Sequence, residues 1–424
     1  MENQIEVAMK PAPLTIVEKN VAAGSCPYLY AWDGRKFRFV TDLLGNSPLG
    51  LSLRRDFVLP ADPDEFVIVG TDKNFRPRRG CYELEVTEEL REVLYLDSAW
   101  LVAVDHAPDI EVYSTDKLGP PPFPPSELWA LRSRKIPAKA VGDDGIDRTE
   151  AVRAVDGIFA PPGPPLPPPL RGVCQPLALT LDFGALDTSR PLVLALTGWI
   201  QYGDASVNIA SSQNKSLAVI PPKLEVETAE RAWQPLDVVI GMPAEKNKTI
   251  LCDLARKLPA DARRLRLTTT FELRWDRIAL FERAAPTDPV RHELEPSGAD
   301  LRFRGFSEIK SRAPGHPQTP AYEKVYARPP AAGLVYAVRR RTRPGEGTRQ
   351  PPDAGQCWRR VKVALRCPCA SAGDKGQSAH VLFLLGGLGQ ERRSQRRCRR
   401  SSRAVARRRG RRLVRGIQHA LGAG

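Results

Sequence analysis

Apolar and polar residues alternate in short runs through much of the first 310 positions, as they do in half-buried β-strands. The clearest run is 265–273, where every second side chain can face a core. Two aromatic runs, 28–32 and 36–40, flank Asp33-Gly34. An Asp-Gly pair in that position is typical of a β-hairpin, because the turn needs a positive φ that glycine adopts easily. The pattern predicts an all-β or mainly β protein with antiparallel sheets.

The strand runs group into two regions. Further strands are expected at 4–17, 65–69, 82–87, 99–104 and 109–113 in the first region, and at 177–181, 192–199, 206–210, 224–228, 237–240, 249–253, 264–273 and 278–282 in the second. Short strands about a dozen residues apart, with few helical periods between them, favour an antiparallel sandwich. We therefore expect a strand-rich N-terminal unit at 1–118 and a β-sandwich at 172–310.

Proline-rich stretches separate these two regions. Residues 119–125 (GPPPFPP) and 161–169 (PPGPPLPPP) cannot form a helix interior or a central strand. The second stretch favours stiff polyproline II, so we interpret 119–171 as a connector with short elements. A ligand for SH3-type domains is the less favoured interpretation of 161–169.

The positive charge of the chain is confined to its end. The formal net charge is +15, but residues 331–424 hold 23 of the 64 Lys and Arg and only 4 of the 49 Asp and Glu. The 41 basic and 45 acidic residues that remain make the body mildly acidic. Because the end also lacks sustained periodicity, it cannot bury enough apolar surface to offset its ordering entropy. We expect 311–424 to be an irregular to disordered basic tail.

Targeting and redox signals are weak. The N-terminal residues have no apolar stretch of signal-peptide length, and the longest apolar run of the tail, 381–389, is shorter than the roughly 20 residues of a membrane span. The sequence therefore predicts no transmembrane segment and no export signal, and it leaves the compartment open. Cys26, Cys81, Cys174 and Cys252 lack the paired spacing of a zinc site, and buried free thiols are favoured over a Cys26–Cys81 disulfide.

No motif for catalysis stands out. The chain has no phosphate-binding glycine loop, nucleophile elbow, zinc-protease helix or dinucleotide fingerprint. His106 follows an apolar strand beside Asp105, where a strand-ending turn is favoured over a general base. Residues 143–147 (DDGID) lack the closing glutamate of a calcium loop and predict a polar turn. We predict no catalytic residue, no metal site and no cofactor.

Tryptophans and their polar neighbours are the candidates for binding. An exposed indole can stack on a sugar ring, although a tryptophan in an apolar strand packs in a core by default. The alternative function is a carbohydrate-active hydrolase. It requires two of the nearby aspartates to lie about 5–10 Å apart. The candidate residues are Trp32, Asp33, Trp199, Asp204, Asn208, Trp275 and Asp276.

Three stretches resemble a signature of large bacterial proteins. They are 26–34 (CPYLYAWDG) continuing to 39–42 (FVTD), 198–208 with its GWI and DASVN motifs, and 243–249 (PAEKNKT) together with 272–276 (ELRWD). In those proteins the signature follows tetratricopeptide repeats, or FG-GAP repeats with an ASPIC/UnbV segment related to cartilage acidic protein. The resemblance covers about residues 15–310. It implies an accessory region of a larger, often exported or cell-surface protein, and it carries over no catalytic residue.

The resemblance ends at about residue 332, where arginine begins to outnumber lysine 21 to 2. High-GC coding sequence read in a shifted frame gives such a composition. If the reading frame is shifted by one base, in the same direction at both places, possible codons for 335–343 and 386–395 encode sequences similar to the family's C-terminus. We hypothesise a frameshift near residue 333, which the nucleotide sequence would test.

The sequence as a whole favours a non-catalytic accessory module that binds other domains of its parent protein or an extracellular ligand such as a glycan. Nucleic-acid binding through the arginine-rich run 392–415 is a further alternative, but we predict no specific nucleic-acid partner, because that run lacks interleaved aromatic residues.

Overall fold

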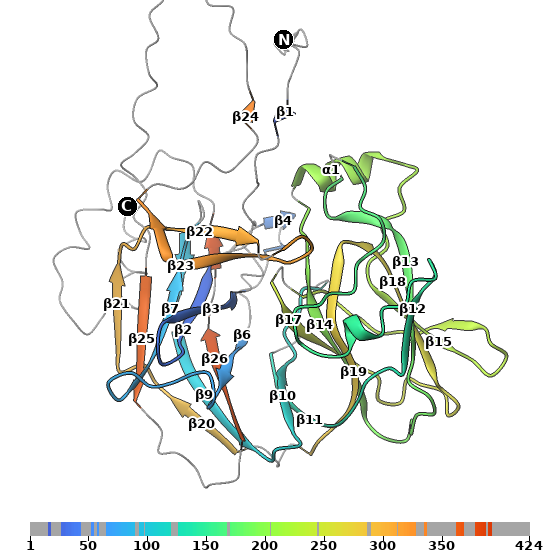
Figure 1. Cartoon of the computed structure of the whole chain (residues 1–424), viewed down its shortest axis with the longest axis horizontal. Coiled ribbons are helices and arrows are strands. Elements are labelled where there is room, and N and C mark those ends of the chain that lie inside the picture. The colour runs from blue at the N-terminus through green and yellow to red at the C-terminus, as the bar shows by residue number, and fades with distance from the viewer. Residues whose placement is uncertain are drawn as a thin grey trace, which may run out of the picture.

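The structure of the chain is a computed structural model. It describes residues 16–17, 27–43, 52–54, 57–58, 65–89, 93–96, 98–119, 126–167, 170–203, 205–243, 246–285, 290–311, 313–327, 335–336, 362–368, 378–386 and 389–391. Antiparallel strands dominate these residues, which confirms the predicted mainly β class. Two lobes lie side by side (Figure 1).

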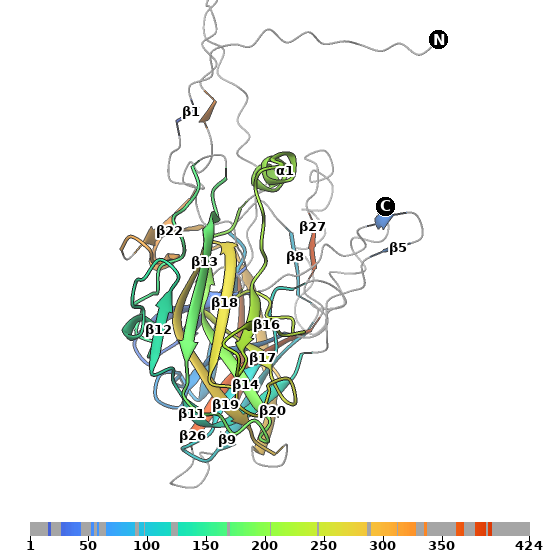
Figure 2. The same ribbon diagram turned by 90° about the vertical axis from the view of Figure 1, so that its right-hand side faces the viewer.

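One lobe is a sandwich of two five-stranded sheets. The inner sheet has the order β10 (Glu111–Ser114), β11 (Leu128–Lys135), β19 (Leu273–Arg283), β14 (Leu192–Ile200) and β17 (Lys248–Asp253). The outer sheet has the order β12 (Lys139–Gly142), β13 (Val173–Asp182), β18 (Arg264–Phe271), β15 (Lys223–Glu227) and β16 (Trp233–Pro235). Figure 2 looks onto β13 and β18, with helix α1 (Ala205–Gln213) at one end of the sandwich.

The other lobe, called here the first lobe, brings together strands far apart in the sequence. One sheet has the order β21 (Gly298–Arg302), β25 (Lys362–Pro368), β7 (Cys81–Thr87), β2 (Tyr28–Trp32) and β3 (Phe37–Asp42). A second has the order β20 (Val290–Leu294), β9 (Ser98–His106), β26 (Ser378–Gly386) and β6 (Glu65–Thr71). Two-stranded pairs join β22 (Phe306–Ser311) to β23 (Gln318–Tyr326), β1 (Ile16–Val17) to β24 (Val335–Tyr336), β8 (Val93–Tyr95) to β27 (Gly389–Glu391) and β4 (Ser52–Arg54) to β5 (Phe57–Val58).

The inner sheet of the sandwich is buried on both faces. All nine residues of β14 are buried. Leu194 and Leu196 face the outer sheet, where they pack with Leu181 and Leu265 in the main core. The alternate residue Val193 belongs to a separate cluster on the opposite face. These nine apolar or small residues form a central strand. Their sequence lacks period-two alternation because both faces of the strand are covered.

A third apolar cluster joins the two lobes. Val102 and Val104 of β9 pack with Ile110, Val112 and Leu128, which lie in or next to β10 and β11. The first lobe and the sandwich therefore share a continuous apolar contact.

The hairpin predicted at Asp33-Gly34 is confirmed. Strands β2 and β3 pair antiparallel on either side of it. Gly34 has φ +103°, and the backbone amides of Arg35 and Lys36 donate to Asp33 Oδ1 at 2.8 and 2.9 Å. These two hydrogen bonds lower the pKa of Asp33, and the bond from Lys36 has the larger effect. Asp33 is thus a turn-forming residue.

The domain limits expected from the sequence change. Strand β10 at the end of the expected first unit and β11 and β12 of the expected connector complete the sandwich. Strands β20 and β21, expected in the sandwich, instead pair with β9 and β25 of the first lobe. Alternation along a strand shows that it is half-buried, but it does not specify the partner strand.

The second proline-rich stretch packs against the sandwich. The amide of Leu166 donates to the Val173 carbonyl at 2.9 Å, and that of Gln175 donates to the Pro164 carbonyl at 2.8 Å. A Cβ on Gly163 would lie 2.2 Å from the Gln175 carbonyl oxygen, so glycine permits this close approach. The expected linker is therefore an edge segment along β13; residues 168–169 lie outside the described residues.

Two expected strands are absent from their positions. Residues 206–210 lie in helix α1, and 237–240 form no strand next to β16. An alternation of only five residues also fits part of a helix, and Ala205 and Ala210 favour helical structure.

Parts of the expected tail form strands. Strand β23 pairs with β22, β25 lies between β21 and β7, and β26 lies between β9 and β6. The segment 311–424, expected to be irregular, thus contains paired strands, while the expected disordered basic tail is consistent with the structure. Apart from β24, β25, β26 and β27, residues 328–424, including the arginine-rich run, lie outside the described residues. Among the residues that are described, no helix has the length and hydropathy needed to cross a membrane.

The polar turn predicted at 143–147 is confirmed and carries an ion pair. Arg148, whose side chain is 2% exposed, donates to both carboxylate oxygens of Asp144 at 2.8 and 2.7 Å. These hydrogen bonds lower the pKa of Asp144 to about 2 from its ordinary 3.8.

We expect Asp144→Asn to destabilise the protein at neutral pH and to have less effect in acid. Because the folded-state pKa is lowered, the ionised carboxylate contributes its full stability above pH 3.8, and this contribution is lost as the pH falls toward about 2. Urea unfolding of both proteins from pH 6 to pH 2 measures the difference. A difference in unfolding free energy that stays constant over this range contradicts the assignment.

Candidate binding cleft between the sandwich and the β22–β23 hairpin

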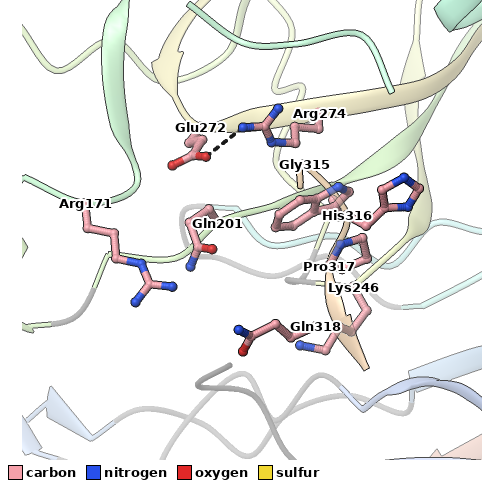
Figure 3. Close-up of a pocket in the computed structure, with 10 residues that line it drawn as sticks. Arg171, Gln201, Lys246, Glu272, Arg274, Gly315, His316, Pro317 and Gln318 are labelled. Carbon is pink, nitrogen blue, oxygen red and sulfur yellow. Dashed lines mark hydrogen bonds and ion pairs between the residues drawn. The ribbon is translucent and has the colours of Figure 1, made fainter. Parts of the chain in front are cut away.

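A cleft of about 160 Å³ lies where the turn of the β22–β23 hairpin meets the sandwich (Figure 3). The hairpin belongs to the first lobe and its turn extends toward the sandwich (Figure 1). Both lobes therefore contribute to the lining, which consists of Arg171, Trp199, Gln201, Lys246, Glu272, Arg274, Gly315, His316, Pro317 and Gln318.

Strand register sets the floor of the cleft. Trp199 on β14 lies directly opposite Arg274 on β19, so the two side chains are on the same face. The guanidinium carbon of Arg274 lies 5.8 Å from the centroid of the Trp199 ring, and its Nη2 donates to Glu272 Oε1 at 3.0 Å. The register therefore fixes a cation, an indole and a carboxylate side by side.

A β-bulge next to these residues explains the Gly-Trp-Ile sequence. The pairing runs from Thr197 opposite Arg277 to Gly198 opposite Trp275, which leaves Asp276 as the extra residue of β19. A Cβ on Gly198 would lie 2.3 Å from the Arg274 carbonyl oxygen, so only glycine fits without displacement.

Backbone bonds hold the chain segments that meet at the cleft. The amide of Gln201 donates to the Glu272 carbonyl at 3.0 Å, and the amide of Glu272 donates to the Gly172 carbonyl at 2.9 Å. Gly172 has φ +85°, and a Cβ there would lie 2.6 Å from the Gln201 carbonyl oxygen. The backbone carrying Arg171, Gln201 and Glu272 is thus closely packed.

The hairpin turn touches the sandwich through aromatic rings. Phe159 makes edge contacts with His316 at 5.3 Å and with Trp199 at 6.3 Å between ring centroids. Gly315 has φ +80°, the left-handed conformation that the turn requires. These contacts position Gly315 and His316 at the rim of the cleft.

A buried polar cluster attaches the hairpin to the first lobe. Ser307 Oγ donates to Glu89 Oε1 at 2.9 Å, Arg304 Nη1 lies 3.4 Å from the same oxygen, and Tyr30 Oη lies 3.1 Å from Ser307 Oγ. Burial, with the adjacent Glu89 charge, raises the pKa of Tyr30, so the phenol stays neutral. The Arg304 guanidinium also lies 4.2 Å from the Tyr322 ring centroid.

Two buried donors at the cleft have no acceptor among the described residues. They are Trp199 Nε1 and Arg274 Nε. Buried donors in folded proteins are nearly always hydrogen-bonded, so these two unpaired donors are unusual. Both atoms are closed to solvent, so they lie behind the surface of the cleft.

Of the residues proposed from the sequence, Trp199 lines the cleft, but it is 5% exposed and cannot offer an open face for sugar stacking. Trp32 lies in the first lobe, where the Arg78 guanidinium covers its ring at 4.4 Å from the centroid. Asn208 is exposed on α1, and Asp204 lies outside the described residues. The candidates that the structure describes therefore do not form one site.

Trp275 and Asp276 have structural roles. Trp275 is buried in the main core. Asp276 accepts hydrogen bonds from the amides of Asp156 and Gly157 and from Asn247 Nδ2, at 3.1, 2.9 and 2.9 Å. Burial raises the pKa of Asp276 despite these bonds. Neither Asp276 nor Asp33 lines the cleft.

Sequence reasoning missed most of the lining, above all Arg171, Lys246, Glu272, Arg274 and Gln318. One signal was available in Glu272-Leu-Arg274-Trp275. Alternate residues of a strand share a face, so Glu272 and Arg274 point away from the face of Trp275, which was the residue chosen.

Residues considered for chemistry are buried or scattered. His106 is 3% exposed, and its Nδ1 lies 2.8 Å from the Ala107 carbonyl oxygen. Within the described part of the chain, no three His, Cys, Asp or Glu side chains are grouped so that they could hold a metal ion. Cys81, Cys174 and Cys252 are free thiols, and burial raises the pKa of Cys174 to about 12 and that of Cys252 to about 11.

Comparisons with known proteins add no information about this cleft. The chain matched no family model, no curated protein and no solved structure.

Proposed function

We propose that the chain is a non-catalytic binding module that holds an anionic, acceptor-rich ligand in the cleft between the sandwich and the β22–β23 hairpin. The cleft lining carries the proposal. Among the described residues it contains three basic side chains, Arg171, Lys246 and Arg274, and one carboxylate, Glu272.

The structural roles of the aspartates favour binding over hydrolysis. Asp33 forms a turn, and Asp276 is fully buried with its oxygens bonded to backbone and amide groups. A glycosidase needs two carboxylates facing one cleft, whereas Glu272 is the one carboxylate that the described residues contribute to the lining. The resemblance to accessory regions of larger bacterial proteins is consistent with a module that binds and does not react.

Thermal unfolding in the presence of anions tests this function. A ligand that binds only the folded state raises the free energy of unfolding with the logarithm of its concentration, by about 2.7 kcal/mol at a concentration of 100 Kd, and so raises the unfolding temperature. We expect glucuronate to stabilise the protein more than sodium chloride of equal ionic strength. Arg171→Gln should lose this increment.

The matched control is Arg190→Gln, because Arg190 pairs with Asp187 at 3.3 Å on an exposed surface away from the cleft lining. It should retain the stabilisation by anions. Equal stabilisation of wild type and Arg171→Gln, or none beyond the effect of sodium chloride, contradicts the proposed function.

A further inference from the structure

The cleft lining combines two kinds of polar group. Figure 3 shows the side-chain amides of Gln201 and Gln318 turned toward the same space, with the Arg171 guanidinium on one side and the Lys246 ammonium on the other. Guanidinium and ammonium groups donate only, whereas a side-chain amide both donates and accepts. The lining is thus suited to a ligand that has both an anionic group and neutral polar groups.

Glu272 distinguishes this cleft from a simple anion site. Its Oε1 accepts from Arg274 Nη2 at 3.0 Å, and its carboxylate remains able to accept further bonds. A bare sulfate or phosphate dianion offers acceptors only and is repelled by this carboxylate. A ligand with hydroxyl groups supplies the donors that Glu272 and the amide oxygens can use.

The size of the cleft limits the ligand to one small unit. Its volume is about 160 Å³. Clefts for drug-sized ligands measure roughly 300–1,000 Å³. A single ring with one charged substituent therefore fits these dimensions better than a polymer chain lying along a groove.

We infer that the ligand is a sugar acid of the hexuronate type, presented singly or at the end of a glycan. This inference rests on the proposed function and specifies its ligand. The carboxylate lies between Arg171 and Lys246 and receives charge-assisted hydrogen bonds. The ring hydroxyls bond to Gln201, Glu272 and Gln318. Because the buried Trp199 offers no open face, recognition depends on polar contacts.

Calorimetric titration of the full chain at low ionic strength with four small probes tests this inference. D-glucuronate has both the carboxylate and the hydroxyls, D-glucose has the hydroxyls, acetate has the carboxylate, and sulfate has charge without hydroxyls. We expect D-glucuronate to bind at least tenfold more tightly than each of the other three.

Two variants test which side chains of the cleft produce the preference for D-glucuronate. Arg171→Gln should weaken D-glucuronate and acetate by similar factors. Gln318→Leu should weaken D-glucuronate about tenfold and leave acetate unchanged, because it removes hydroxyl contacts only. Arg190→Gln is again the control and should match wild type.

The possible failures separate the ligand class from the proposed function. If acetate or sulfate binds as tightly as D-glucuronate, the hydroxyl contacts are absent and the sugar-acid inference is overturned, while an anion-binding module stands. If D-glucose binds as tightly as D-glucuronate, the acidic group is irrelevant and both the inference and the anion-binding proposal fall. If none of the four probes binds, the proposed function is rejected with it.

Discussion

Replacing Glu89 with alanine should destabilise the protein by about 3–5 kcal/mol, the usual effect of removing one partner of a buried ion pair. Glu89 is 5% exposed, and it accepts hydrogen bonds from Ser307 while pairing with Arg304 at 3.4 Å. Its loss leaves the Arg304 guanidinium, whose side chain is 11% exposed, without its carboxylate partner. Urea unfolding measures the change in free energy.

The same substitution should weaken ligand binding, although Glu89 does not line the cleft. The cluster attaches the β22–β23 hairpin, and the turn of that hairpin supplies residues 315–318 to the cleft. Glu323→Ala is a matched control on the hairpin, because Glu323 is 60% exposed and only 3.8 Å from the exposed Lys36. We expect the control to change stability by no more than about 0.5 kcal/mol. A Glu89→Ala protein as stable as this control contradicts the role of the cluster.

Gly198→Ala should destabilise the protein by about 1–3 kcal/mol, because the added methyl group overpacks a strand interface. The new Cβ would lie 2.3 Å from the Arg274 carbonyl oxygen and 2.8 Å from Trp275 Cε3. Backbone atoms cannot move aside as the end of a flexible side chain can. The shift of β19 should also separate Trp199 from Arg274 and lower the affinity for anions.

Gly298→Ala provides the comparison, since it adds a methyl group to strand β21 where no atom lies within 4 Å. Chemical denaturation should show Gly298→Ala within about 0.5 kcal/mol of wild type. Equal stability of the two alanine variants would show that the bulge tolerates a side chain and that the packing described for Gly198 is incorrect.

Local features of the fold could be predicted from the sequence because neighbouring residues determine them. The Asp33-Gly34 hairpin follows from turn chemistry and two adjacent aromatic runs, and the strand at 192–199 follows from eight apolar or small residues in succession. The polar turn at 143–147 is equally local. Each of these features involves residues within a few positions of one another.

Pairing between distant strands could not be predicted. Strand β26 lies between β9 and β6, which are more than two hundred residues away in the sequence, and no local pattern specifies that position. The same reason explains the assignment of β20 to the first lobe. Any half-buried strand can in principle extend any apolar sheet edge, so the choice depends on the whole structure.

The binding cleft could not be predicted from the sequence for a related reason. Its lining comes from five separate segments, around Arg171, Trp199, Lys246, Glu272 and Gln318. The sequence drew attention to tryptophans and aspartates, whereas the structure gives Trp275 and Asp276 roles in packing. Arginine and glutamine are common on surfaces, so their convergence becomes visible only after folding.

The most direct test of the central claim is the indole resonance of Trp199 in ¹⁵N–¹H spectra during titration with D-glucuronate and, separately, sulfate. The chain has seven tryptophans, and the signal absent from Trp199→Phe identifies the one of interest. Because Trp199 lines the cleft and its ring lies 5.8 Å from the Arg274 guanidinium, a bound anion should shift this resonance progressively to saturation. A Trp199 resonance that stays in place while the anion saturates the protein would place the ligand elsewhere and contradict the account.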